Sequence, residues 1–163
     1  MPTVYVETTI PSYLTATPSR DLVVAAQQQI THDWWRTATE RFDLFVSELV
    51  LEEIRAGDPE FAARRVEAVR GLPVLRQNND VRSLVRIYRE HLGLPDRART
   101  DVVHIAFAVA YELDYLVTWN CAHIANGHVL RRLMEINHSL GRFSPLLLTP
   151  GELLETPNGE DPC

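Results

Sequence analysis

Residues 115–125 read YLVTWNCAHIA, an apolar run that ends abruptly in polar side chains. Tyr115, Leu116 and Val117 favour a buried strand. Thr118 and Asn120 are not residues that a chain needs simply to finish one. In a parallel α/β sheet, ligands bind just beyond the carboxyl ends of the strands. The run therefore indicates a functional sheet edge, if the rest of the chain forms such a sheet.

The rest of the chain alternates short apolar strands with helices. Besides residues 114–118, strands are predicted over residues 3–6, 43–47, 72–75 and 145–149. Helices are predicted over 19–41, 49–56, 59–70, 81–91, 101–112 and 129–136, with a helical turn at Pro11. Ser19, Asp58 and Thr100 are the expected N-caps, and Trp34 is expected to pack in the core. This alternation predicts a parallel sheet covered on both faces.

The bulk properties of the 163 residues fit one soluble domain, expected over residues 1–150 with a frayed tail over 151–163. Residues 1–10 show no secretory signal, and the most apolar stretch, 102–110, is too short to span a membrane. Cys121 and Cys163 suggest no disulfide framework. We therefore expect a cytoplasmic protein. The net charge of −6 argues against a general nucleic-acid coat protein. It leaves open an acidic enzyme that acts on nucleic acid through metal ions.

Acidic and polar residues gather at the predicted carboxyl edge of the sheet. Glu7 follows the first strand, Glu52 and Glu53 lie on the helix after the second, and Asp101 opens the helix before the strand that ends near Asn120. Facing carboxylates repel one another unless a cation neutralises them. Oxygen ligands select Mg²⁺ or Mn²⁺, whose usual chemistry is phosphoryl transfer. Taken singly, Glu52 and Glu53 also read as solvated helix charges, and Asp101 as an acid that favours a helix N-terminus. The set together favours a site.

Other chemistries find less support. The seven glycines are too widely spaced for a phosphate-binding loop, and there is no Gly-x-Ser-x-Gly elbow. Cys121, His123 and His128 match no zinc spacing. His104 lies one turn after Asp101 and so shares its helix face. We interpret it as a packed or supporting histidine rather than a general base.

Four segments together resemble a known family. They are VYVETTIPSYL (4–14), VSELVLEEI (46–54), RTDVVHIAFAVAYELDYLVTWN (99–120) and CAHIAN (121–126). In this order they are similar to the PIN-domain ribonucleases, and among these to the VapC-type toxins of bacterial toxin–antitoxin pairs. The resemblance covers about residues 3–150.

The resemblance implies a three-layer α/β/α sandwich with a mostly parallel sheet of about five strands. It implies a Mg²⁺- or Mn²⁺-dependent endoribonuclease toxin that acts on RNA, often as a homodimer, and is inhibited by a cognate antitoxin protein. The family's acids fall on Glu7, Glu53, Asp101 and, in fourth place, Asn120. Glu7, Glu53 and Asp101 would hold the metal. Thr8, Thr118 and His104 would support the carboxylates by hydrogen bonding.

The chain departs from the family pattern at two positions. The family usually has aspartate where Glu7 stands, and often aspartate where Asn120 stands. Glutamate reaches one methylene further, and asparagine offers a carbonyl oxygen without negative charge. These departures leave a second hypothesis open: a catalytically weakened PIN-fold module that binds protein or RNA.

Overall fold

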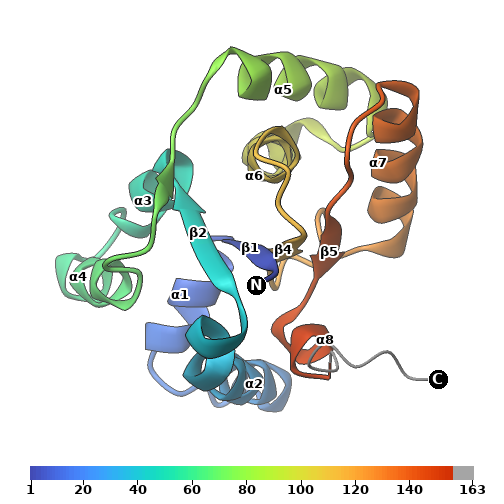
Figure 1. Cartoon of the computed structure of the whole chain (residues 1–163). Helices are drawn as coiled ribbons and strands as arrows, with labels where there is room; N and C mark the ends of the chain where they lie inside the picture. Colours follow the sequence, from blue (N-terminus) through green and yellow to red (C-terminus); the bar gives the residue numbers. More distant parts are fainter. Residues whose placement is uncertain (156–163) are drawn as a thin grey trace.

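A five-stranded sheet forms the centre of the molecule, and helices pack on both of its faces (Figure 1). The computed structural model describes residues 1–155. The strands are β1 (Thr3–Val6), β2 (Asp43–Ser47), β3 (Val74–Leu75), β4 (Tyr115–Val117) and β5 (Leu146–Leu148). The helices are α1 (Thr9–Thr15), α2 (Leu22–Arg41), α3 (Glu48–Ile54), α4 (Pro59–Ala68), α5 (Asn79–His91), α6 (Arg99–Ala110), α7 (Gly127–Ser139) and α8 (Pro150–Leu154), with a 3-10 turn, η1 (Asp96–Ala98).

All neighbouring strands pair in parallel, in the order β3-β2-β1-β4-β5. Tyr5 in β1 is in register with Phe45 in β2 and Leu116 in β4. The predicted parallel α/β sheet is therefore confirmed. After β1 the chain builds β2 and β3 on one side and β4 and β5 on the other. The order of strands thus reverses between β1 and β4, which is where open α/β sheets usually bind their ligands.

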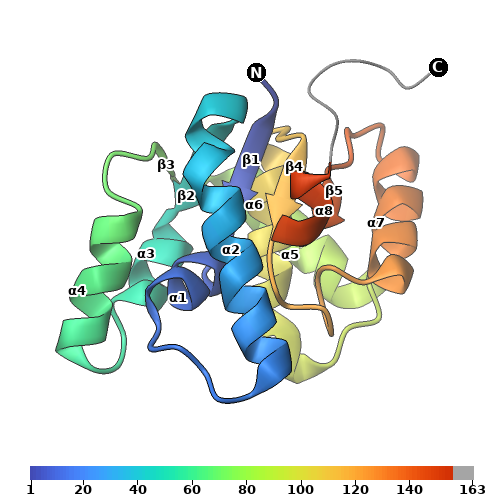
Figure 2. The same cartoon turned by 90° about the horizontal axis from the view of Figure 1, so that it is seen from below.

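Helices α1, α2 and α8 cover one face of the sheet, and α5, α6 and α7 lie on the other (Figures 1 and 2). Helices α3 and α4 lie at the β3 end. Because both faces are covered, the strands are apolar on both sides, and Val4, Tyr5 and Val6 are all fully buried. Trp34 is also fully buried, as expected of a core residue.

Two helix starts differ from expectation. Asp21, not Ser19, caps α2: its Oδ1 accepts the backbone N–H groups of Val23 and Val24 at 2.9 and 3.1 Å. Thr100 does not cap α6, because the 3-10 turn η1 leads directly into that helix and Ala98 stands at the cap position. Asp58 caps α4 as predicted, accepting the N–H groups of Glu60 and Phe61.

The folded chain continues beyond residue 150. Helix α8 packs against α2, and Leu153 is fully buried. Thr149 and Glu152 form a reciprocal capping box at its start. The remainder of the expected tail, residues 156–163, lies outside the described residues. Between residues 1 and 155, no helix has both the length and the apolar character to cross a membrane.

An ion pair fastens the loop after α7 to the first turn of α5. Arg142 donates two hydrogen bonds to the carboxylate of Asp80, one of them at 3.0 Å. The guanidinium holds the pKa of Asp80 below its usual 3.8. We expect Arg142→Gln to lower the free energy of unfolding by about 1 kcal/mol near pH 7, a value discounted because both side chains are about a third exposed.

The pH dependence of this effect has a defined sign. A depressed pKa stabilises the fold above the unfolded-state value, and this contribution is lost as the pH falls through the folded-state value. The difference between parent and Arg142→Gln should therefore shrink below pH 3.8. Urea titrations of both proteins at neutral and acid pH measure it. Arg36→Gln, which breaks only the i,i+3 pair with Asp33, is the control and should cost less than about 0.5 kcal/mol.

Candidate active site

Glu7 is buried at the carboxyl end of β1, beside the end of β4, with only 4% of its surface exposed. Its Oε2 accepts three hydrogen bonds: from the backbone N–H of Thr9 at 3.0 Å, the Thr9 hydroxyl at 2.6 Å and the Thr118 hydroxyl at 2.7 Å. Three donors on one oxygen fix the orientation of the carboxylate. The other oxygen, Oε1, accepts no hydrogen bond from residues 1–155 and faces Nε2 of His104 at 4.0 Å.

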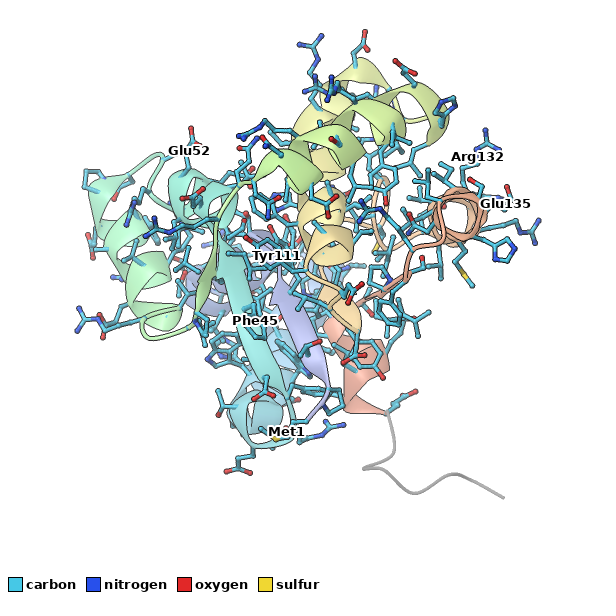
Figure 3. The ribbon with its side chains drawn as sticks, turned by 45° about the horizontal axis from the view of Figure 1, so that its top comes forward. Met1, Phe45, Glu52, Tyr111, Arg132 and Glu135 are labelled. Carbon is cyan, nitrogen blue, oxygen red and sulfur yellow. The ribbon has the colours of Figure 1, made fainter. Side chains whose placement is uncertain are left out.

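Glu53 approaches the same histidine from α3. Its Oε1 lies 2.6 Å from Nε2 of His104 and accepts the Thr8 hydroxyl at 2.7 Å. The two carboxylates therefore converge on one nitrogen from two different elements. Glu52, the neighbouring residue on α3, is exposed and points outward (Figure 3). Its separation from Glu53 follows from the roughly 100° turn per residue of a helix.

A line of buried hydrogen bonds orients His104. Its Nδ1 lies 2.7 Å from the hydroxyl of Tyr5, which lies 2.7 Å from the hydroxyl of Ser47. An ionised carboxylate can only accept, so Nε2 carries the proton toward Glu53. The Tyr5 hydroxyl shares one hydrogen bond with Nδ1 and another with the Ser47 hydroxyl. Strand β1, the start of α3 and helix α6 are thereby joined through side chains at the sheet edge.

Two groups in this line have shifted pKa values. Burial raises the pKa of Glu53, but the hydrogen bond and charge of His104, together with the Thr8 hydrogen bond, outweigh it. The net pKa of Glu53 therefore lies below its usual 4.5. Burial raises the pKa of Tyr5 well above its usual 10.0, so this phenol stays protonated and available as a donor.

Asp101 and Asn120 are engaged differently. Asp101, in the first turn of α6, accepts a hydrogen bond from Nδ1 of His123 at 3.0 Å. Asn120 uses its side-chain oxygen to accept the backbone N–H of His123, also at 3.0 Å. Asn120 thus shapes the turn after β4, and that turn carries His123 to Asp101.

The donor chemistry of these residues fits a hard cation, because carboxylate oxygens dominate and thiolates are absent from the group. Glu7 and Glu53 converge, and Glu7 retains an oxygen without a donor in residues 1–155. Asp101, the third predicted ligand, is held by His123 instead. Over the described range, no three His, Cys, Asp or Glu side chains are grouped so that they could hold a metal ion. Glu7 and Glu53 thus form a converging pair of carboxylates, and the third acid, Asp101, lies one turn before His104 on α6.

Several residues of this network were not foreseen from sequence. Tyr5 reads simply as a strand residue, and its hydroxyl becomes meaningful only once the sheet directs it toward α6. Ser47 reads as the last residue of a strand, and the structure shows that it also caps α3 by accepting the N–H of Val50. Thr9 contributes both a hydroxyl and an N–H to Glu7. His123 carried one usable signal: it follows an asparagine by three residues, the spacing of a local side-chain turn.

Comparison with known proteins bears on the fold. No protein-family description and no curated protein matches this sequence. Among solved structures, the crystal structure of VapBC2 from Rickettsia felis bound to a DNA fragment from their promoter aligns with a TM-score of 0.55 and 16% sequence identity. The alignment covers 72% of this chain and 87% of the matched chain. At this identity the likeness concerns the backbone alone. With five parallel strands between helical layers, the chain has the PIN-like α/β/α fold that its sequence resemblance implied.

Proposed function

We propose that this protein is a metal-dependent endoribonuclease and the toxin of a toxin–antitoxin pair, inhibited by a cognate antitoxin protein and active as a homodimer. One observation carries the proposal. Two carboxylates, Glu7 and Glu53, converge within 4.0 and 2.6 Å of the same histidine nitrogen at the carboxyl edge of a PIN-like parallel sheet. Such a pair is costly to bury unless positive charge compensates it. Converging carboxylates of this kind are most readily explained by a catalytic site that binds a cation.

The residues of the chain have separate tasks in this proposal. Glu7, Glu53 and Asp101 would hold Mg²⁺ or Mn²⁺, which when bound supplies a Lewis acid for the phosphodiester. Thr9 and Thr118 orient Glu7 through hydrogen bonds. His104 holds Glu53, and Tyr5 fixes the ring of His104. Asn120 positions the turn at Asp101 through the backbone of His123.

A second candidate function has a specific observation in its favour. Asp101 is bonded to His123, and the Asn120 oxygen is used by a backbone amide, so only two carboxylates converge. This arrangement also suits a PIN-fold module that binds protein or RNA without cutting it. Calorimetric titration with Mn²⁺ discriminates between the two functions. Binding at millimolar concentration or tighter supports the nuclease, and absence of binding to folded protein supports the module.

Metal removal gives the direct test of activity. We expect purified, antitoxin-free protein to cleave a mixed single-stranded RNA in Mn²⁺ or Mg²⁺. Excess EDTA should abolish cleavage, and added metal should restore it, because the carboxylates alone cannot neutralise a phosphodiester. Gel electrophoresis of end-labelled RNA measures the products. No cleavage by well-folded protein, or cleavage that chelator leaves unchanged, would contradict the proposal.

A further inference from the structure

A hollow of about 800 Å³ lies beside the candidate site, between α3, α5 and α6. Helix α5 lines it with Arg82, Arg86 and Arg89, and α3 lines the opposite wall with Glu48 and Glu52. Figure 3 shows Glu52 pointing outward from α3. The basic wall is thus supplied by one helix of a protein whose net charge is −6.

The three arginines of α5 form one stripe. Their spacing of four and three residues places them on a single helix face, about 6 and 4.5 Å apart along the axis. Arg86 and Arg89 form no hydrogen bond or ion pair with any residue of the described chain, and Arg82 bonds only the neutral side chain of Asn79. Arg64 on α4 and Arg70, two residues after that helix ends, are each paired with a glutamate. The stripe therefore presents uncompensated positive charge.

The stripe leads toward the acidic residues. Arg89 also lines a second hollow of about 180 Å³, together with Arg99 at the start of α6. Arg99 stands two residues before Asp101. The larger hollow and the site also share walls: α3 gives Glu52 to the hollow and Glu53 to the site. Helix α6 likewise gives Val103 to the hollow and His104 to the site.

The exposed charge of the hollow favours a polyanion, although Leu49, Val85, Val103 and Phe107 also line it. Protein interfaces bury an apolar centre. None of the exposed large hydrophobic residues of the described chain lines this hollow; they are Met1, Leu22, Val23, Val74, Met134, Leu140, Phe143 and Leu146. Nucleic-acid interfaces are instead polar and positive, and arginine suits phosphate geometry. The acidic side chains of the hollow, Glu48 and Glu52, come from α3, and Glu48 accepts the backbone N–H of Gln77. An anion would therefore follow the α5 wall, where the arginines lie.

We propose that Arg82, Arg86, Arg89 and Arg99 bind successive phosphates of single-stranded RNA and lead the strand to the acidic site. This inference rests on the proposed nuclease function, since it names the path of that site's substrate. The contacts are electrostatic and independent of base sequence. They weaken with salt in proportion to the number of phosphates neutralised.

The test compares two double variants that each remove two positive charges. Arg86→Gln/Arg89→Gln changes the stripe, and Arg64→Gln/Arg70→Gln changes α4 and the turn that follows it. Glutamine has a helix propensity close to that of arginine, so both variants should fold. Fluorescence anisotropy with a labelled single-stranded RNA, in EDTA to prevent cleavage, gives affinity at several salt concentrations. We expect the stripe variant to bind about tenfold more weakly and its log–log salt slope to fall by about 1.4. The control should match the parent.

Each other outcome has a defined meaning. Equal losses in both variants, or no loss in either, overturn the proposed path. A stripe variant with parental RNA affinity but altered self-association in sedimentation also overturns it and makes the hollow a contact between copies. Cleavage of the same RNA in Mn²⁺ separates this inference from the proposed function. Parental cleavage with unchanged binding in the stripe variant sinks the path alone, whereas stripe-dependent binding without cleavage sinks the nuclease alone.

Discussion

Glu53→Gln is expected to lower the rate of Mn²⁺-dependent RNA cleavage by about a thousandfold, whereas Glu52→Gln keeps it within about threefold. The two residues are neighbours on α3 and undergo the same chemical change. Only Glu53 contacts His104 and Thr8. Glutamine keeps the shape of the side chain and removes its charge, which is the property that a hard cation requires.

The measurement is initial cleavage rate at saturating RNA, with circular dichroism and thermal unfolding to show that all proteins are folded. Asp101→Asn enters the same assay, because Asp101 is held by His123 rather than by the converging pair. If Glu53→Gln and Asp101→Asn each lose cleavage activity, the result supports a site of three acids. Equal activity of the Glu53 and Glu52 variants would contradict the assignment of Glu53.

His104→Ala is expected to destabilise the fold by about 3 kcal/mol. The ring is 1% exposed and links the carboxylate of Glu53 to the hydroxyl of Tyr5. Its removal leaves a cavity, strips Glu53 of its shortest hydrogen bond and takes one partner from a buried phenol. His128→Ala is the matched control, because His128 is exposed and should change stability by less than about 0.5 kcal/mol.

This destabilisation should depend on pH in a stated direction. Glu53 has a folded-state pKa below 4.5, so its interaction with His104 stabilises the protein above that value. As the pH falls through the folded-state pKa, Glu53 becomes protonated and its part of the difference between parent and His104→Ala is lost. Urea titrations at neutral pH and below pH 4.5 measure this. A constant difference would show that cavity formation alone accounts for the effect.

The sheet edge could be predicted because parallel strands bring their carboxyl ends together. Glu7, Thr118 and the start of α3 follow from that rule, and β1 and β2 have the expected bounds, Thr3–Val6 and Asp43–Ser47. The side-chain line from Ser47 through Tyr5 to His104 could not be predicted. It depends on which face of the sheet α6 covers and on how deeply that helix sits, and neither is a local property of the chain.

The surroundings of Asp101 escaped prediction for a different reason. Its contact with His123 depends on the conformation of the loop after β4, which is shaped by a hydrogen bond from a backbone amide to Asn120. Sequence places Asn120 at the end of the strand and suggests a ligand. The structure shows that its side-chain oxygen accepts the backbone N–H of His123 in the turn after β4. An asparagine side chain can bond to the nearby backbone or contact groups distant in sequence, and only the three-dimensional structure shows which it does.

The hydrogen bond between Glu7 and Thr118 spans 111 residues. During synthesis at roughly 5 to 20 residues per second, Glu7 leaves the peptidyl transferase centre about 5 to 20 s before the threonine that completes its setting. Glu53 likewise precedes its histidine by 51 residues. A nascent or truncated chain that stops before β4 therefore carries the acids but lacks Thr118 and His123, which hold Glu7 and Asp101. The complete setting of the acids therefore forms only after residue 123 has been synthesised.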